Sequence, residues 1–175
     1  MTSSTAEIAL TDPAGKATVL GDYRASPLIV ILVRYFGCLP CQDYLGQLTA
    51  SRNQFPADAD VVAVGGSAPY QARWLRDSKG VSLPLLLDPE ERVRAVAEVG
   101  NLSVRELTSW QGATNYLKAM RHGYMPQVPT SDARKAPGII VFDREFHPLW
   151  VHRGETLGDY PTVDELVATV GALTA

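Results

Sequence analysis

The sequence has little of what builds disulfide-rich, membrane-spanning or nucleic-acid-binding proteins. Two cysteines among 175 residues are too few for a scaffold held together by disulfides. The longest apolar run, Leu28 to Val33, is far shorter than the roughly 20 residues of a membrane helix. Sixteen Lys and Arg against nineteen Asp and Glu give a net charge of -3, without a basic block. We therefore expect neither a membrane span nor a nucleic-acid partner.

The composition is that of an ordinary globular chain, with 46% hydrophobic and 20% charged residues. This is enough to bury a sizeable core, and no internal repeat divides the chain, so residues 1–175 are predicted to form a single domain. Residues 1–12 show no basic stretch followed by an apolar one, so no export signal is visible. We expect a cytoplasmic protein.

Hydrophobic periodicity predicts strands that alternate with helices through the first two thirds of the chain. This alternation favours an α/β sandwich around a mixed sheet, with a hairpin at each end of the sequence. A longer connection with apolar residues at partly helical spacing, Asn101 to Lys135, is predicted to be an insertion packed on the domain. The predicted strands are the hairpin 7–20 with its turn at 12–15, and 28–33, 60–64, 83–87, 138–142 and 149–152; the helices are 41–55, 68–78, 90–99 and one that Thr162 caps.

The two cysteines form a C-x-x-C motif directly after the apolar strand 28–33. The pattern places Cys38 just before a helix and Cys41 in its first turn. A helix amino terminus stabilises a thiolate, which is the reactive form of cysteine, and two thiols one turn apart can close a disulfide. The motif therefore indicates redox chemistry.

Two plainer interpretations of the motif are inert buried thiols and half of a zinc site. Zinc would need two further ligands, and the close histidine pair, His147 and His152, lies more than 100 residues after Cys41. Five residues apart on a strand, these histidines would also face opposite sides. We expect no bound metal and no cofactor.

Several segments resemble the alkyl hydroperoxide reductase and thiol-specific antioxidant (AhpC/TSA) branch of the thioredoxin superfamily, and most closely its peroxiredoxin-like proteins with a C-x-x-C. The similar segments cover nearly all of the chain: 8–16, 30–41, 85–93 with its LLLDPEERV sequence, 110–120, and 149–153 through 159–166. The resemblance implies a thioredoxin-like three-layer α/β/α sandwich with a mixed central sheet, an N-terminal β-hairpin and an inserted helical segment.

The resemblance also implies a function. It suggests a thiol-dependent antioxidant oxidoreductase that reduces hydroperoxides or exchangeable disulfides, with electrons from a thioredoxin-like protein or a low-molecular-weight thiol, and it leaves a homodimer open. The sequence departs from typical peroxiredoxins, because the P-x-x-x-T-x-x-C pattern ending at Cys41 has Arg34 and Cys38 at its proline and threonine positions. It departs from thioredoxins in having Leu32 where a buried acid usually precedes the first cysteine.

We hypothesise that Cys38 attacks the substrate and that Cys41 then closes an intramolecular disulfide. Peroxiredoxin alignments place the attacking thiol at Cys41 instead, so the order of attack stays open. A dithiol redox sensor without turnover and a thioredoxin-like binding module are the alternative functions.

Four further residues are candidates for substrate binding. Arg34 ends the strand four residues before Cys38, where a cation could lower a thiol pKa and orient a peroxide. Tyr35 and Phe36 flank the turn and could shield the thiol from water, although aromatic residues there also suit plain core packing. Pro137 precedes the strand 138–142 and could lie beside the dithiol as a cis-proline; an ordinary proline at the start of a strand is the alternative.

Overall fold

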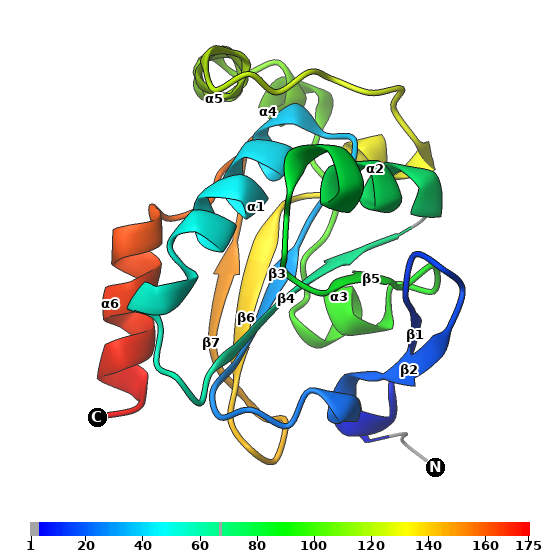
Figure 1. Cartoon of the computed structure of the whole chain (residues 1–175). Coiled ribbons are helices and arrows are strands. Elements are labelled where there is room, and N and C mark those ends of the chain that lie inside the picture. Colours follow the sequence, from blue (N-terminus) through cyan, green and yellow to red (C-terminus); the bar gives the residue numbers. More distant parts are fainter. Residues whose placement is uncertain (1–3, 67) are drawn as a thin grey trace.

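A mixed β-sheet forms the middle layer of the protein (Figure 1). The computed structural model describes residues 4–66 and 68–175, and in these residues the sheet has seven strands in the order β2-β1-β5-β4-β3-β6-β7. Strand β3 is parallel to β4 and antiparallel to β6. The strands are β1 (Ala9–Thr11), β2 (Ala17–Val19), β3 (Leu28–Leu32), β4 (Asp60–Gly65), β5 (Leu85–Leu87), β6 (Gly138–Phe142) and β7 (Pro148–Arg153).

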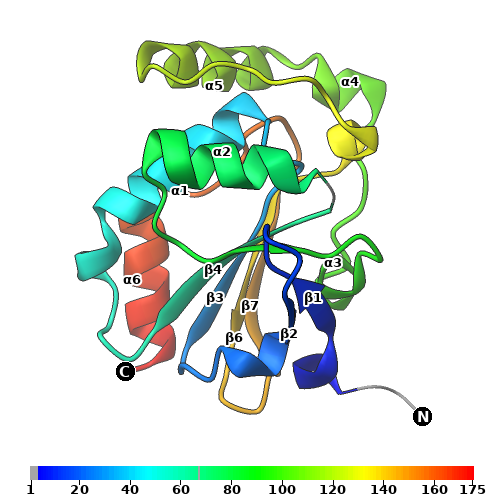
Figure 2. The same ribbon diagram turned by 45° about the vertical axis from the view of Figure 1, so that its right-hand side comes forward.

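Helices cover both faces of the sheet, so the three predicted layers are confirmed (Figure 2). Helices α1, α2 and α6 pack on the face to which Ile29 and Ile31 of β3 point. Helix α3 packs on the face of Val30 and Leu32, and apolar side chains of the N-terminal hairpin join the same core. Because both faces are covered, every residue of β3 is buried, as its continuous apolar run predicts. The helices are α1 (Leu39–Ala50), α2 (Pro69–Lys79), α3 (Arg92–Val96), α4 (Val104–Leu107), α5 (Trp110–Arg121) and α6 (Val163–Leu173).

The local signals at both ends of the chain fold as predicted. In the first hairpin, β1 pairs with β2, and Asp12 Oδ1 accepts hydrogen bonds from the N–H groups of Ala14 and Lys16 in the turn. At the start of α6, Thr162 Oγ1 accepts from the N–H of Glu165, whose carboxylate accepts from the N–H of Thr162. This reciprocal pair is the predicted capping box.

The predicted helix 90–99 is shorter in the structure. Helix α3 begins at Arg92 because Glu91 has a left-handed backbone (φ 58°), and it ends at Val96. Asp88 Oδ2 accepts a hydrogen bond from the Val93 N–H and so satisfies one donor of the first turn.

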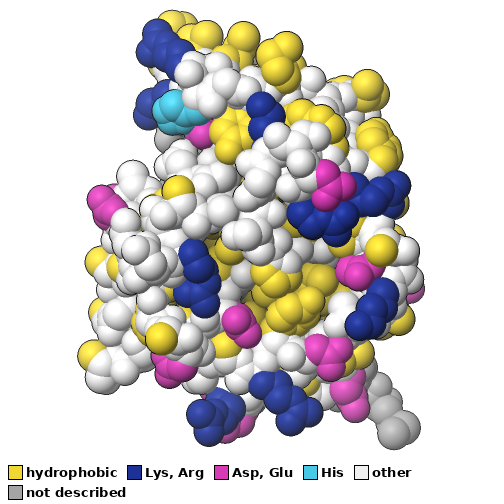
Figure 3. Space-filling view, viewed as in Figure 1, with side chains coloured by type: hydrophobic (Ala, Val, Ile, Leu, Met, Phe, Trp, Pro, Cys, Tyr) yellow, Lys and Arg dark blue, Asp and Glu magenta, His cyan; other side chains and the backbone are white. Residues whose placement is uncertain are grey.

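The segment 101–135 forms α4 and α5, and α5 lies along the outer side of α1 (Figures 1 and 2). Its inner residues Gly112 and Ala119 are buried, which confirms that the insertion packs on the domain. Its apolar stripe, however, faces outward, and hydrophobic side chains gather over this end of the molecule in the space-filling view (Figure 3). The exposed residues are Trp110, Leu117 and Met120 of α5, with Met125 and Val128 in the segment that follows it. Among the described residues, every helix is too short or too polar to cross a membrane.

Candidate functional site

The turn between β3 and α1 holds both cysteines where the sequence predicts them. Cys38 is the N-cap residue of α1, and Cys41 lies in the first turn of the helix. The Cys38 N–H donates to the carbonyl of Tyr35, and the Cys38 carbonyl accepts from Gln42, so backbone bonds fix the turn. Both thiols are free, and both residues have an exposed fraction of 0%. The dithiol is therefore reduced and closed off from solvent.

Four side chains form a hydrogen-bonded chain through the two sulfur atoms. Arg34 Nη1 donates to Cys38 Sγ over 3.4 Å, and the Cys38 thiol donates to Cys41. From the other side, Tyr160 Oη lies 3.5 Å from Cys41 Sγ and 3.0 Å from the Leu32 carbonyl oxygen. Cys41 thus receives donors from two directions, while Cys38 both accepts and donates.

The two thiols have opposite pKa shifts. Burial raises the pKa of Cys41, but the hydrogen bonds from Cys38 and Tyr160, together with the Arg34 charge, outweigh it and lower the pKa to about 6. Burial and the neighbouring Cys41 raise the pKa of Cys38 well above its ordinary value. This order favours Cys41 as the thiolate, the alternative that the peroxiredoxin resemblance suggests, over our hypothesis that Cys38 attacks first.

Arg34 is a buried cation whose charge faces sulfur. Its side chain is 4% exposed, Nε donates to the Lys135 carbonyl over 3.0 Å, and the guanidinium carbon lies 5.7 Å from the centroid of the Tyr35 ring. None of the ion pairs formed within 4–66 and 68–175 includes Arg34. Burial lowers the pKa of Arg34, but Cys38 and Cys41 more than offset this and raise it. The structure therefore places Arg34 beside the thiols, and its role toward a peroxide stays a prediction.

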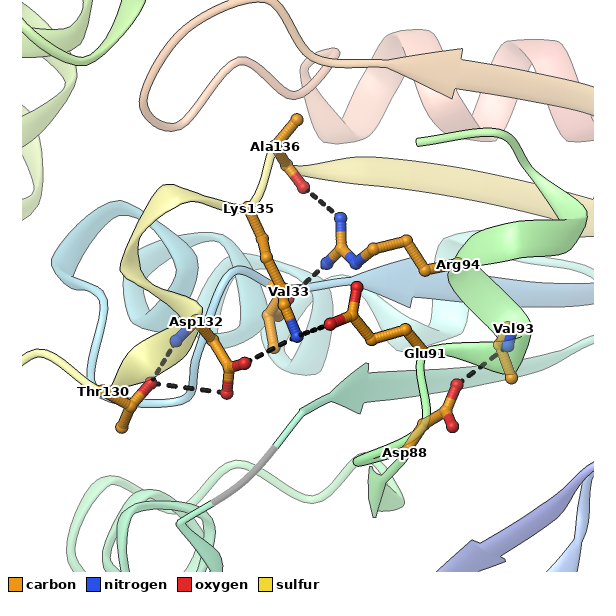
Figure 4. A network of polar contacts seen from close by, with 9 residues as sticks. All are labelled: Val33, Asp88, Glu91, Val93, Arg94, Thr130, Asp132, Lys135 and Ala136. Carbon is orange, nitrogen blue, oxygen red and sulfur yellow. Dashed lines mark hydrogen bonds and ion pairs between the residues drawn. The ribbon is translucent and has the colours of Figure 1, made fainter. Parts of the chain in front are cut away.

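A second polar network fixes the backbone to which Arg34 is bound (Figure 4). Arg94 donates to the Val33 carbonyl (2.9 Å) and to the Ala136 carbonyl (2.5 Å), so it joins the end of β3 to the segment before β6. Lys135 Nζ lies 2.7 Å from Glu91 and 2.6 Å from Asp132. Because Arg34 Nε binds the Lys135 carbonyl, these contacts hold its acceptor in place.

The aromatic residues of the turn divide between the site and the core. Tyr35 lies beside the dithiol, where burial and the Cys38 charge raise its pKa, and it forms a side-chain hydrogen bond with Tyr116 of α5. Phe36 is 0% exposed and packs against β4, so close to Gly65 that a side chain there would collide with its ring. Tyr35 is at the site, and Phe36 belongs to the core.

Pro137 is not the cis-proline that the thioredoxin-like sheet allowed for. The cis peptide bond among the described residues is Ser26–Pro27, and Ala136–Pro137 is trans. The Pro137 carbonyl accepts from the Gly154 N–H over 2.8 Å, and its ring lies against Gly154. Pro137 therefore extends the β6–β7 pairing, and the interpretation as a proline at the start of a strand is correct.

Two glutamines that the sequence did not single out fasten a covering segment over the turn. Gln71 of α2 accepts from the Gly37 N–H (3.0 Å) and donates to the Val128 carbonyl (2.9 Å). Gln42 of α1 donates to the carbonyls of Gly37 (2.9 Å) and Met125 (3.3 Å). Residues 125–128, which we call the covering segment, are thus tied to the turn that carries Cys38.

Within the residues that the structure describes, no three His, Cys, Asp or Glu side chains are grouped so that they could hold a metal ion.

Comparison with known proteins yields one family and several related structures. The model of the AhpC/TSA family matches residues 2–115. Peroxiredoxin-like 2C from Bos taurus is 26% identical over 96 residues, which are 53% of this chain and 42% of that protein, so the match spans less than half of the relative's length.

Solved structures match over nearly the full chain. The bacterioferritin comigratory protein of Xanthomonas campestris superposes with a TM-score of 0.70 at 14% identity, covering 98% of this chain and 94% of the other. Peroxidoxin BcpB of Mycobacterium tuberculosis gives 0.69 at 16% identity, covering 97% and 95%. DsbF of the same bacterium gives 0.55 at 17% identity, covering 99% of both chains. These likenesses confirm the predicted thioredoxin-like fold.

Proposed function

Because the chain belongs to the AhpC/TSA family, we propose that it is a thiol-dependent peroxidase in which Cys41 attacks a hydroperoxide and Cys38 resolves the product. The observation that carries this proposal is the chain of donors that ends at Cys41 Sγ, from Arg34 through Cys38 on one side and from Tyr160 on the other. A structural neighbour, the Xanthomonas campestris protein, is described as having alkyl peroxide reduction activity, which supports the same class of substrate.

The first step uses the thiolate of Cys41. Its sulfur attacks the terminal peroxide oxygen and the O–O bond breaks, so that Cys41 becomes a sulfenic acid and the leaving alkoxide takes a proton from water. Tyr160 and Arg34 serve this step by keeping the sulfur anionic near neutral pH. Arg34 also supplies a charge within reach of the developing alkoxide.

The second step closes the C-x-x-C disulfide. Cys38, whose pKa is raised, is held as a thiol next to Cys41. Its sulfur attacks the Cys41 sulfenic acid, the S–OH bond breaks, and water leaves with the Cys38 proton. A cellular thiol then reduces the disulfide and returns both cysteines to the starting state.

The proposal is tested by following peroxide consumption with the protein far below the peroxide concentration and dithiothreitol as the reductant. We expect many turnovers per protein molecule, and no turnover in Cys41→Ser. Consumption that stops after one equivalent of peroxide would contradict a peroxidase.

A second function, a dithiol redox sensor, is favoured by the burial of both sulfurs at 0% exposure. A sensor predicts slow oxidation in a single event, followed by a change in the covering segment 125–128 that is tied to the turn. The turnover experiment separates the two, since only the peroxidase consumes excess peroxide.

A further inference from the structure

A cavity of about 230 Å³ lies beside the dithiol, behind Tyr160. We propose that this cavity binds a small thiol that carries a carboxylate, and that this thiol reduces the Cys38–Cys41 disulfide. The inference rests on the proposed function, because it identifies the reductant of the same dithiol.

Three elements build the walls of the cavity. Helix α1 contributes Pro40, Asp43, Tyr44 and Gln47, α5 and its C-cap residue contribute Asn115, Lys118 and His122, and the loop before α6 contributes residues 158 and 160–162. Larger hollows of about 570, 620 and 480 Å³ lie elsewhere, by the N-terminal hairpin, at the end of α1 and beside α4, and Tyr160 lines none of them.

Tyr160 connects the cavity to the sulfur atoms. It lines the cavity, stacks on Tyr44 with ring centroids 4.4 Å apart, and places its hydroxyl 3.5 Å from Cys41 Sγ. One aromatic side chain therefore separates the cavity from Cys41. A rotation of the Tyr160 side chain would open a path to the sulfur without unfolding α1.

The size of the cavity and the burial of the dithiol together favour a small reductant. A protein reductant must bring its own cysteine into contact with a disulfide sulfur, and here both cysteines are 0% exposed. The volume is below the roughly 300–1,000 Å³ of pockets that hold drug-sized ligands, so it suits a smaller molecule.

The charges around the cavity favour an anion. Lys118 is the cation of the wall, which also includes the imidazole of His122. The wall carboxylate, Asp43, is already bound, because Oδ1 lies 2.7 Å from His122 Nδ1 and Oδ2 accepts from Gln47 over 3.0 Å. Glu165, just behind Thr162, is likewise occupied by the N–H and hydroxyl of Thr162. Lys118 takes part in none of the ion pairs of the described chain, so it is available to a ligand carboxylate.

The chemistry balances with two molecules of the thiol. The first attacks Cys41 Sγ as a thiolate, the S–S bond breaks, and Cys38 leaves as a thiolate that Arg34 stabilises from 3.4 Å. A second thiolate attacks the mixed disulfide, which releases the oxidised small molecule and the Cys41 thiolate. Cys38 then takes up one proton from water.

The test measures reduction of the oxidised protein by two thiols of similar size and opposite charge, mercaptoacetate and cysteamine. The disulfide is formed with diamide, so that the test does not depend on peroxidase activity. Rate constants are expressed per thiolate and read by intact mass after acid quenching. We expect mercaptoacetate to react faster, and Lys118→Ala to slow it about two- to fivefold, the range of an exposed ion pair, with little effect on cysteamine.

Two matched controls make the result specific. Arg121→Ala removes another exposed cation of α5, one that does not line the cavity, and should leave both rates unchanged. Gln47→Trp fills the cavity rim and should slow both thiols, whereas Gln111→Trp on exposed α5 should not. Equal slowing by Lys118→Ala and Arg121→Ala, unhindered reduction of Gln47→Trp, or reduction by reduced thioredoxin but by neither small thiol would each overturn the inference. A protein that forms no disulfide with peroxide, yet reacts as expected after diamide, would refute the proposed function alone.

Discussion

Tyr160 contributes to the site through a single hydrogen atom. Its hydroxyl proton is directed at two acceptors, the Leu32 carbonyl at 3.0 Å and Cys41 Sγ at 3.5 Å. When Cys41 is a thiolate, the charged acceptor draws the stronger bond, because hydrogen bonds to ions are roughly twice as strong as neutral ones. The residue therefore stabilises the anionic state of Cys41 more than its neutral state.

Replacing Tyr160 with Phe should raise the pKa of Cys41 by about one unit, since one charged hydrogen bond is worth roughly 1.5 kcal/mol. The peroxide reaction needs the thiolate, so its rate should rise with pH through an inflection at about 6 in the wild type and at a higher pH in the variant. A one-unit shift lowers the rate about fivefold near pH 6 and leaves it unchanged in alkaline solution. Thiolate absorbance in the ultraviolet and stopped-flow oxidation across pH measure both effects.

Tyr23→Phe, on the opposite face of the sheet, is the control for the loss of a hydroxyl. The assignment of Tyr160 fails if its Phe variant keeps the inflection of the wild type.

At the residue scale, the sequence predicted contacts between residues that are close in the chain and missed contacts between residues that are far apart in it. Cys38, Cys41 and Arg34 lie within one strand-turn-helix unit, so local periodicity places them together. Tyr160 is 119 residues from Cys41, and its contact depends on how the loop before α6 packs on α1. A partly buried tyrosine next to a helix cap gives no periodic signal, and only the family-like segment 159–166 pointed to that region.

Among the elements, the covering segment 125–128 is tied to the turn that carries Cys38, so we expect it to limit access to the dithiol. Gln71 and Gln42 hold it to Gly37 by four hydrogen bonds, and the Gln127 N–H adds a fifth to the Gly37 carbonyl. A side chain at residue 37 would meet Gln71 and Gln127 at less than 3 Å, so glycine permits this close approach. The small size of Gly37 and the hydrogen bonds of Gln42 and Gln71 therefore together hold the covering segment against the turn.

Gln71→Leu should loosen the covering segment while it preserves the size of the side chain. The change leaves the buried Gly37 N–H without an acceptor, at a cost of about 1–3 kcal/mol. We expect faster alkylation of the cysteines by a bulky maleimide and faster hydrogen exchange at the Gly37 amide. Gln111→Leu, on the exposed side of α5, should change neither rate. Unchanged alkylation in Gln71→Leu would show that the segment does not control access.

The elements themselves were largely predictable because their signals are local. The apolar runs gave β3, β4 and β6, and the capping box gave the start of α6. Both ends of α3 were missed, since the left-handed residues Glu91, before the helix, and Glu98, after it, are not encoded by a glycine or proline. The apolar stripe of α5 was interpreted as packing, but periodicity cannot tell an inward face from an outward one.

Across the whole molecule, stability comes from the two layers packed on the sheet, and the outward stripe of α5 contributes little to it. Leu166 of α6 is 0% exposed in the core beneath α1, whereas Trp110 of α5 is 83% exposed. Leu166→Ala should lower the free energy of unfolding by about 2–5 kcal/mol, and Trp110→Ala should change it by no more than about 0.5 kcal/mol. Urea denaturation gives both values, and a large loss in Trp110→Ala would place that side chain in a contact made by a second molecule.

The central claim is that Cys41 attacks and Cys38 resolves, and intact mass after a peroxide pulse tests it most directly. Fully reduced wild type, Cys38→Ser and Cys41→Ser are mixed with hydrogen peroxide and quenched with acid at increasing times. The account predicts that wild type loses two hydrogens, that Cys38→Ser gains one oxygen at a comparable rate, and that Cys41→Ser stays reduced. Rapid addition of oxygen to Cys41→Ser, with Cys38→Ser unreactive, would contradict it and assign the attack to Cys38.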